Sequence, residues 1–407
     1  MTDTRPASTF RTLAILAATQ IISWGTLYYA FAIVARDIMG DLGLRAELVF
    51  GAFSWCLLVA GLAATPAGIL IDRYGGRPVM AAGSILCGIG FIILAKATGP
   101  INFMLAWTVL GVAMAAVLYE AAFATITHLF GAGSRRLISI LTLFAGFAST
   151  VFWPLTLKVN TLVGWRDTYW YYALLHLLVC LPLHLLIERA PLAERPSARK
   201  DAKADMTLQQ ALRHPAFWNL AFAFAANGFI FSALSVHLIP IFTGLGHAPG
   251  SVVVMAALIG PMQVAGRICE MTFARNVAPE TVGAVSFAFL PGALAALLFF
   301  GASQTAMGLF CVLYGLSNGI LTIVRGTIPQ VLFGARNYGA ISGAMSGPSL
   351  LAKAAGPLAV AAIIESTPSA TVLFSVLLAF SVTSLIFYLL ALRAPAPSTP
   401  TTIAETS

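Results

Sequence analysis

The stretch Gly68-Ile-Leu-Ile-Asp72-Arg73-Tyr74-Gly75-Gly76-Arg77-Pro78 places a charged, glycine-bearing turn between two long apolar runs. Gly75 and Gly76 permit a chain reversal that needs a positive φ. Pro78 fits the first turn of a following helix, where its missing N–H costs nothing. The stretch therefore predicts a tight turn between two helices that cross a membrane.

The charged residues of this turn leave three arrangements open. The Asp72 carboxylate can pair with Arg73, pair with Arg77, or cap the end of a helix. Basic residues in a short loop are typical of the cytoplasmic side of a membrane protein. We interpret the turn as a short cytoplasmic loop.

The composition of the chain agrees with a membrane location. Its 407 residues are 59% hydrophobic and 9% charged, whereas soluble domains contain about 25% charged residues. The chain is therefore expected to be an all-α polytopic membrane protein. The five cysteines are far apart inside apolar runs, so neither a disulfide framework nor a cysteine metal site is expected. They are Cys56, Cys87, Cys180, Cys269 and Cys311.

Twelve apolar runs are long enough to cross a hydrocarbon core, which takes about 20 helical residues. A polar segment at 189–215 separates the first six runs from the last six and predicts a cytoplasmic linker between halves at 1–188 and 216–393. Thr207 to Gln210 resembles a capping box inside it, and the Pro-, Thr- and Ser-rich tail at 394–407 is expected to be disordered. The runs lie near 12–35, 48–71, 79–97, 101–127, 137–160, 168–188, 216–242, 251–274, 281–301, 305–330, 338–364 and 371–392.

Lysine and arginine residues indicate the orientation in the membrane. Three of the 23 lie deep inside apolar runs, fifteen lie at or beyond the run ends on the side of both termini, and five lie at or beyond the run ends on the other side. This excess predicts cytoplasmic termini in a cell membrane, which would be the inner membrane of a Gram-negative bacterium. The net charge of +8 thus needs no nucleic-acid partner, although it favours contact with anionic lipid headgroups.

Ionisable residues inside membrane spans are costly and mark functional sites. This chain has five of them: Glu120, Arg267, Glu270, Arg325 and Lys353. Four of them lie in three polar stripes at helical spacing, and we expect these stripes to line a common water-filled cavity. The stripes are Gln263, Arg267 and Glu270; Asn318, Thr322 and Arg325; and Ser346, Ser349 and Lys353.

Three cations against two anions leave at least one positive charge without a protein partner. A substrate carboxylate would supply one, and an arginine such as Arg267 offers it two parallel N–H donors. The alternative is a set of structural ion pairs, such as Arg267 with Glu270 or Glu120 with one of the cations. Glu120 is the only acid deep in the N-terminal half. It can couple transport to a proton or form a permanent bridge between the halves.

The turn resembles the signature of the major facilitator superfamily, in which a glycine, three residues and Asp-Arg are followed by a residue, a glycine and basic residues. Its matching residues are Gly68, Asp72, Arg73, Gly75 and Arg77, whereas Gly76 departs from the usual basic residue. The resemblance implies two six-helix halves, alternating access to a small-molecule substrate, and a cytoplasmic gate formed by the five matching residues.

The superfamily plan also implies a degenerate copy of this turn after the eighth span. In one register Gly266 and Glu270 correspond to Gly68 and Asp72. In the other, equal span lengths counted from Ser251 place Arg275 opposite Asp72. We prefer the second register, which puts Arg267 near the middle of the membrane.

Two short segments resemble monocarboxylate and oxalate/formate carriers. The run from Gln263 to Arg267 ends on an arginine like theirs, although Gln263 replaces the aspartate of the monocarboxylate carriers. The segment Ser23-Trp24-Gly25-Thr26-Leu27-Tyr28-Tyr29 is similar to their first helix, with Tyr28 at a lysine position of the animal proteins.

These observations predict a transporter, without enzymatic activity or a cofactor, that moves a small organic anion with protons as a monomer in the lipid bilayer. Glu120 is the expected proton-coupling residue. Two alternatives stay open: proton-driven efflux of an amphipathic or cationic compound, and a sensor or scaffold that transports nothing. The expected substrate-binding residues are Arg267, Arg325, Lys353, Tyr28, Gln263 and Asn318.

Overall fold

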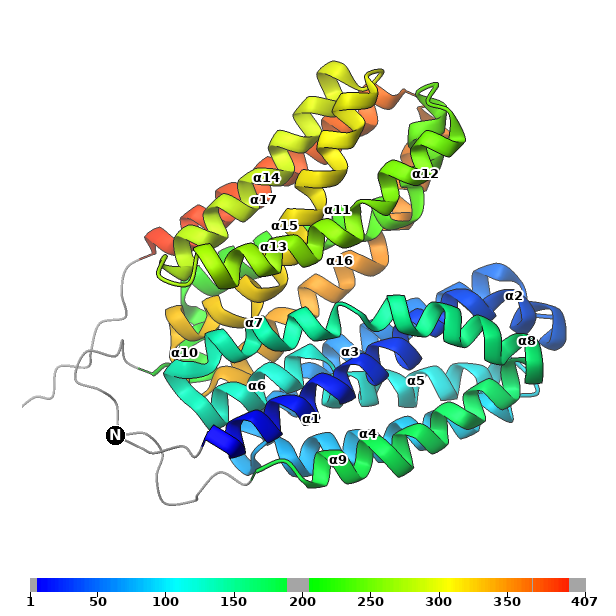
Figure 1. Ribbon diagram of the computed structural model, residues 1–407, viewed down its shortest axis with the longest axis vertical. Coiled ribbons are helices and arrows are strands. Elements are labelled where there is room, and N and C mark those ends of the chain that lie inside the picture. The colour runs from blue at the N-terminus through cyan, green and yellow to red at the C-terminus, as the bar shows by residue number, and fades with distance from the viewer. Residues whose placement is uncertain (1–5, 189–204, 368, 395–407) are drawn as a thin grey trace, which may run out of the picture.

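The computed structural model describes residues 6–188, 205–367 and 369–394. The predictions made for residues 189–204 and 395–407 lie outside this range. Within it the chain is helical and contains no strand, and its helices form two bundles (Figure 1).

The first bundle contains twelve helical elements. They are α1 (Pro6–Trp24), η1 (Gly25–Tyr29), α2 (Ala30–Leu42), α3 (Ala46–Tyr74), α4 (Gly76–Ala95), α5 (Pro100–Val117), α6 (Tyr119–Phe130), η2 (Gly131–Gly133), α7 (Ser134–Ala145), α8 (Ala148–Leu175), η3 (His176–Cys180) and α9 (Leu181–Leu185).

The second bundle follows the short helix α10 (Leu208–Arg213). Thr207 and Gln210 exchange hydrogen bonds at the start of α10, which confirms the capping box. The remaining helices are α11 (Pro215–Gly244), α12 (Pro249–Ala257), α13 (Ile259–Phe273), α14 (Pro279–Phe300), α15 (Gln304–Phe333), α16 (Tyr338–Ser366) and α17 (Ala370–Arg393).

The described helices are long enough for twelve membrane crossings. Eleven segments are long and apolar enough to span a membrane, and one of them, Ser134–Leu185, has 52 residues. A single crossing takes about 20 residues, so this segment is long enough to cross twice. The backbone leaves the helical conformation at Gly164 (φ 81°, ψ 170°), where glycine tolerates a positive φ. The predicted fold class is therefore confirmed.

Each bundle buries its own apolar core. Trp107, Phe91 and Tyr169 belong to the core of the first bundle, and Phe242 and Phe310 belong to that of the second. Because these two cores lie inside the bundles, the interface between the bundles can carry polar residues without interrupting either one.

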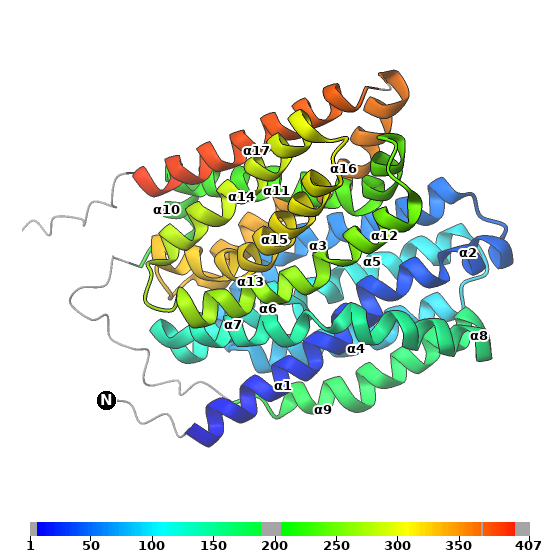
Figure 2. The ribbon, with the colours of Figure 1, turned by 45° about the horizontal axis from the view of Figure 1, so that its top comes forward.

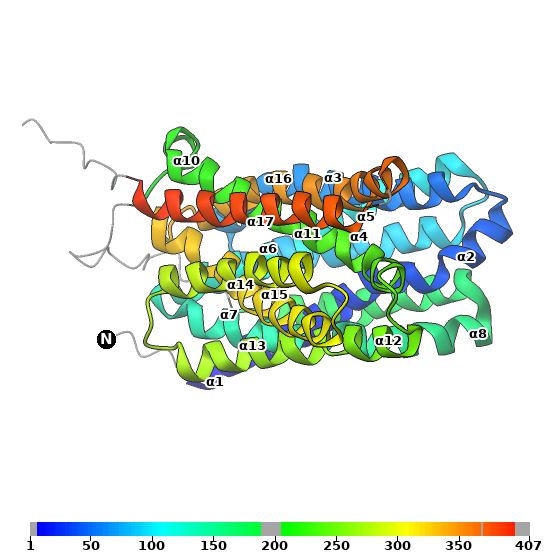
Figure 3. The ribbon, with the colours of Figure 1, turned by 90° about the horizontal axis from the view of Figure 1, so that it is seen from above.

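Both ends of the described chain lie at the same end of the bundles, together with α10 (Figures 2 and 3). We call this end, which also carries the turn at Gly75, the linker side. The bundles lie closest to each other toward the linker side and diverge toward α2 and α12 (Figure 1). The main contacts between them pair α16 with α3 and α6, and α7 with α13 and α15.

Candidate functional site

An ion pair joins the two bundles. Leu118 is extended (φ −84°, ψ −164°), so α5 ends there and Glu120 falls in the first turn of α6. Its Oε1 atom accepts a hydrogen bond of 2.6 Å from Nη2 of Arg325 on α15, and Ser346 Oγ on α16 lies 3.2 Å from both atoms. Two of the three predicted polar stripes therefore meet at Glu120.

Lys353 lies two helical turns beyond Ser346 on α16. Its aliphatic chain packs near Gly228 of α11, and its backbone carbonyl accepts a hydrogen bond of 2.7 Å from Ser232 Oγ. No carboxylate among the described residues pairs with its ammonium group.

Arg267 is a buried cation without an anionic partner in the described part of the chain. Its exposed fraction is 4%, it forms no ion pair there, and its Nε atom has no hydrogen-bond acceptor. The guanidinium lies against Gly146 of the other bundle, where a Cβ atom would overlap Nη1. An unpaired buried charge costs several kcal/mol, so this arginine is suited to an anion that enters from outside.

Glu270 is not the partner of Arg267. Its carboxylate accepts hydrogen bonds from Arg135 Nη2 at 2.8 Å and Ser139 Oγ at 2.9 Å, both on α7 of the other bundle. The proposed pairing of Arg267 with Glu270 is thus absent from this conformation.

The preferred register after the eighth span is wrong. Glu270 lies three residues before the end of α13 and contacts the other bundle, as Asp72 does near the end of α3, whereas Arg275 lies beyond α13. Counting failed because the eighth span has 25 residues and the second has 29. The register that equates Glu270 with Asp72 describes the structure. The burial of Arg267, which the preferred register predicted, is nevertheless observed.

Aromatic side chains gather around a π-helical segment of the first span, η1. The ring of Trp24 lies 5.5 Å from that of Tyr28 and 4.9 Å from that of Tyr119. The Trp24 Nε1 atom is buried and has no acceptor among the described residues. Tyr28 belongs to η1, whose backbone departs from regular α-helical geometry. Single turns of π-helix often occur at functional sites.

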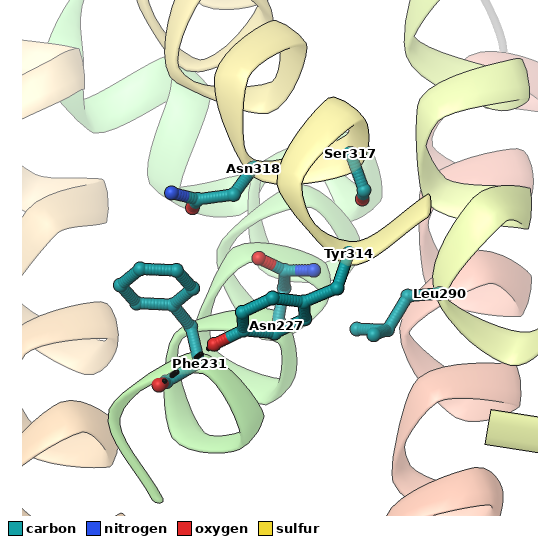
Figure 4. Close-up of a pocket in the computed structure, with 6 residues that line it drawn as sticks. All are labelled: Asn227, Phe231, Leu290, Tyr314, Ser317 and Asn318. Atoms are coloured by element: carbon teal, nitrogen blue, oxygen red, sulfur yellow. Dashed lines mark hydrogen bonds between the residues drawn. The ribbon is translucent and has the colours of Figure 1, made fainter. Parts of the chain in front are cut away.

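Asn318 lines a small pocket within the second bundle (Figure 4). Asn227 of α11 faces the same pocket, and the Tyr314 hydroxyl donates a hydrogen bond of 3.1 Å to the Phe231 carbonyl. Sequence reasoning missed Asn227, although an asparagine in the middle of an apolar run was an available signal.

Gln263 does not join this pocket. Its backbone packs against Gly319 of α15, where a Cβ atom would overlap the Gln263 carbonyl. No described residue forms a hydrogen bond with its side-chain amide, and no hydrogen bond joins Arg267 to Asn318 or Lys353. The stripe of Gln263, Arg267 and Glu270 therefore does not join the other two stripes in this conformation.

Asp72 caps a helix of the opposite bundle. Its two oxygens accept hydrogen bonds from the backbone N–H groups of Gly339 at 2.9 Å and Ala340 at 2.8 Å, in the first turn of α16. Of the three arrangements left open by the sequence, the helix cap is the one formed. The Arg73 guanidinium instead lies 5.2 Å from the centre of the Tyr74 ring, and Arg77 forms no ion pair with a described residue.

The two glycines of the turn have different roles. Gly75 has a positive φ of 80°, as expected, whereas Gly76 is already the first residue of α4. Helix α4 thus begins before Pro78. A Cβ atom at Gly76 would overlap the side chain of Thr125, so this departure from the usual basic residue permits close packing on α6.

Glycines also bring α3 and α16 together. A Cβ atom at Gly68 would overlap the Gly339 carbonyl, and one at Gly343 would overlap the carbonyl of Ala64. We call the contact of Gly68 and Asp72 with Gly339 and Ala340 the latch. It holds the bundles together on the linker side.

The substitution Gly68→Ala is expected to destabilise this closed arrangement. The added methyl group must displace α16, and such overpacking costs about 1–3 kcal/mol. Gly51→Ala is the matched control, because Gly51 lies in the same helix with nothing within 4 Å of an added Cβ atom. Thermal unfolding in detergent should show a lower midpoint for Gly68→Ala and an unchanged or higher one for Gly51→Ala. Equal midpoints would contradict the role of Gly68 in the latch.

Comparison with known proteins identifies relatives over most of the chain. Residues 13–357 match the family model described as Major Facilitator Superfamily. A Thermoproteus tenax protein, named as an uncharacterized 38 kDa protein in a 23S RNA operon, is 28% identical over 320 residues, which cover 77% of this chain and 78% of that protein. An Escherichia coli protein named as the uncharacterized MFS-type transporter YhjX is 29% identical over 178 residues, which cover 42% of this chain and 44% of YhjX.

Solved structures share the fold. The human organic anion transporter MFSD10 aligns with a TM-score of 0.70 and 16% identity, covering 93% of this chain and 99% of that one. The Escherichia coli fucose:proton symporter FucP aligns with a TM-score of 0.72 and 13% identity, covering 94% and 99%.

Proposed function

Because the chain belongs to the Major Facilitator Superfamily, it is a secondary transporter of a small solute rather than an enzyme, and we propose that this solute is a small organic anion moved together with protons. The observation that carries the proposal is Arg267, a buried arginine with no described anionic partner. A carboxylate bound there would balance the charge and accept two parallel hydrogen bonds.

Lys353 and Arg325 would assist Arg267 in binding the anion. The ammonium group of Lys353 has no described carboxylate partner, so it is available to a second oxygen of the anion. Arg325 becomes available only when it leaves Glu120. Tyr28, Gln263 and Asn318 are proposed to contact the uncharged part of the solute through ring and amide groups.

Glu120 is proposed to couple the anion to a proton. In this conformation its carboxylate holds Arg325 across the bundle interface. A proton on Oε1 would remove the negative charge, so the attraction for Arg325 would weaken and the guanidinium could turn to the solute. Protonation and anion binding would then favour each other, which is the requirement for moving both together.

The bundles are proposed to rock about this site by alternating access. The latch would hold the linker side closed here through Gly68 and Asp72, while Arg73, Gly75 and Arg77 belong to the same turn. The predominance of lysine and arginine on the linker side favours a cytoplasmic location for it and for both termini.

The names of the structural neighbours include an organic anion in one case and a proton in the other. Their likeness to this chain is one of fold, so the proposal depends on Arg267 instead. The efflux of a cation receives less support, because the Glu120 carboxylate that would bind the cation is already paired with Arg325.

Uptake into proteoliposomes tests the proposal. Labelled acetate, lactate or oxalate should accumulate when the outside is made more acidic than the inside, and the uncoupling of the proton gradient should abolish this accumulation. Transport of tetraphenylphosphonium alone would support cation efflux instead. A lack of counterflow for every solute in the set would favour a sensor or scaffold.

A further inference from the structure

A second cavity lies on the linker side, away from the proposed transport site. It has a volume of about 300 Å³ and lies between the two bundles, next to the latch. Residues from α3, α10, the turn before α16 and the first turn of α16 line it. They are Ile69, Asp72, Arg73, Leu208, Arg336, Asn337 and Ala340.

The charge of this cavity is positive. Arg73 belongs to the first bundle and Arg336 to the second, and both side chains are exposed. Neither forms an ion pair with a described residue. The cavity therefore presents one unpaired guanidinium from each bundle.

The nearby acids do not neutralise these arginines by direct pairing. Asp72 accepts the two backbone hydrogen bonds of the latch. Asp205, which precedes α10, accepts backbone hydrogen bonds from Ala335 at 2.9 Å and Arg336 at 3.2 Å. Neither carboxylate forms an ion pair with Arg73 or Arg336, so among the described residues no acid occupies the two guanidinium groups.

The surroundings of the cavity combine polar and apolar groups. Ile69 is 45% exposed and Tyr74 is 59% exposed, and both lie in the last turns of the membrane-spanning helix α3. Apolar side chains exposed at this level can contact acyl chains, whereas the guanidinium groups of Arg73 and Arg336 are suited to the oxygens of a phosphate group.

We propose that the cavity binds the phosphate group of an anionic ligand between Arg73 and Arg336. The phosphate belongs either to the headgroup of an anionic phospholipid or to a small molecule in solution. Because the two arginines come from different bundles, they face one cavity only while α3 and α16 are packed together. Bound phosphate therefore stabilises the arrangement that is closed on the linker side.

The test compares nanodiscs of phosphatidylcholine with nanodiscs that also contain phosphatidylglycerol. The second membrane should raise the thermal unfolding midpoint of the full-length protein, and native mass spectrometry should detect bound phosphatidylglycerol. Arg73→Gln and Arg336→Gln should each weaken this binding about fivefold, since a basic residue near an anionic surface contributes about 1 kcal/mol. Inorganic phosphate and glycerol 3-phosphate, added to phosphatidylcholine nanodiscs, form the other arm.

Arg393→Gln is the matched control, because Arg393 is exposed at the same end of the molecule but does not line the cavity. Stabilisation by phosphatidylglycerol alone, lost in the two cavity variants, identifies the lipid headgroup as the source. Stabilisation by inorganic phosphate or glycerol 3-phosphate, lost in the same two variants, identifies a small molecule in solution as the source. The proposal is overturned if both cavity variants keep the full effect, or if Arg393→Gln loses as much as they do.

Discussion

Replacing Arg267 with alanine is expected to abolish measurable uptake of a small carboxylate into proteoliposomes. The loss of one partner from a buried charge pair costs about 2 kcal/mol or more, so the affinity for the anion should fall at least about thirtyfold. Arg267→Lys keeps the charge but cannot provide two parallel donors. Its affinity for the anion should lie between that of the unaltered protein and that of Arg267→Ala. The measurement is the dependence of initial uptake rate on carboxylate concentration.

Arg275→Ala is the control for this experiment. Arg275 follows the same helix, α13, but is exposed, so its removal should leave the affinity within about twofold, as expected for a surface substitution. Unchanged affinity in both Arg267→Ala and Arg267→Lys would show that the anion binds elsewhere.

Glu120→Gln is expected to separate exchange from accumulation. Glutamine keeps the size of the side chain and its ability to accept a hydrogen bond from Arg325, but it carries no charge and takes up no proton. The variant should exchange labelled for unlabelled carboxylate while failing to accumulate it when a pH gradient is imposed. Both quantities are measured in the same proteoliposome preparation.

Glu270→Gln provides the comparison, since Glu270 also forms an ion pair between the bundles, with Arg135. Loss of this ion pair should weaken the contact between the bundles on the linker side. Proton-driven accumulation of the carboxylate should be unchanged. Full accumulation in Glu120→Gln would assign the coupling role to another group.

Much of the fold could be predicted from local patterns. Apolar runs of sufficient length give the spans, because a helix in lipid must satisfy its own backbone hydrogen bonds. The turn at Gly75 could be predicted because glycine tolerates the positive φ observed there. The burial of Arg267 also followed from its position inside an apolar run.

Partners across the bundle interface could not be predicted in the same way. Glu120 and Arg325 are 205 residues apart in the chain, and no periodicity connects them. Arg135 lies outside the predicted spans, in the first turn of α7, yet it provides the partner of Glu270. The sequence left three arrangements open for Asp72, because a carboxylate suits a helix end and an arginine about equally. The structure shows the cap on α16.

The central claim is that Arg267 binds the carboxylate of the solute, and a thermal-shift measurement tests it most directly. A ligand that binds only the folded state must stabilise it. Purified protein is heated with a series of small carboxylates and, separately, with lipophilic cations. The account predicts a higher unfolding midpoint with at least one carboxylate and no such rise in Arg267→Ala. Stabilisation by cations alone, or an equal rise in Arg267→Ala, would contradict it.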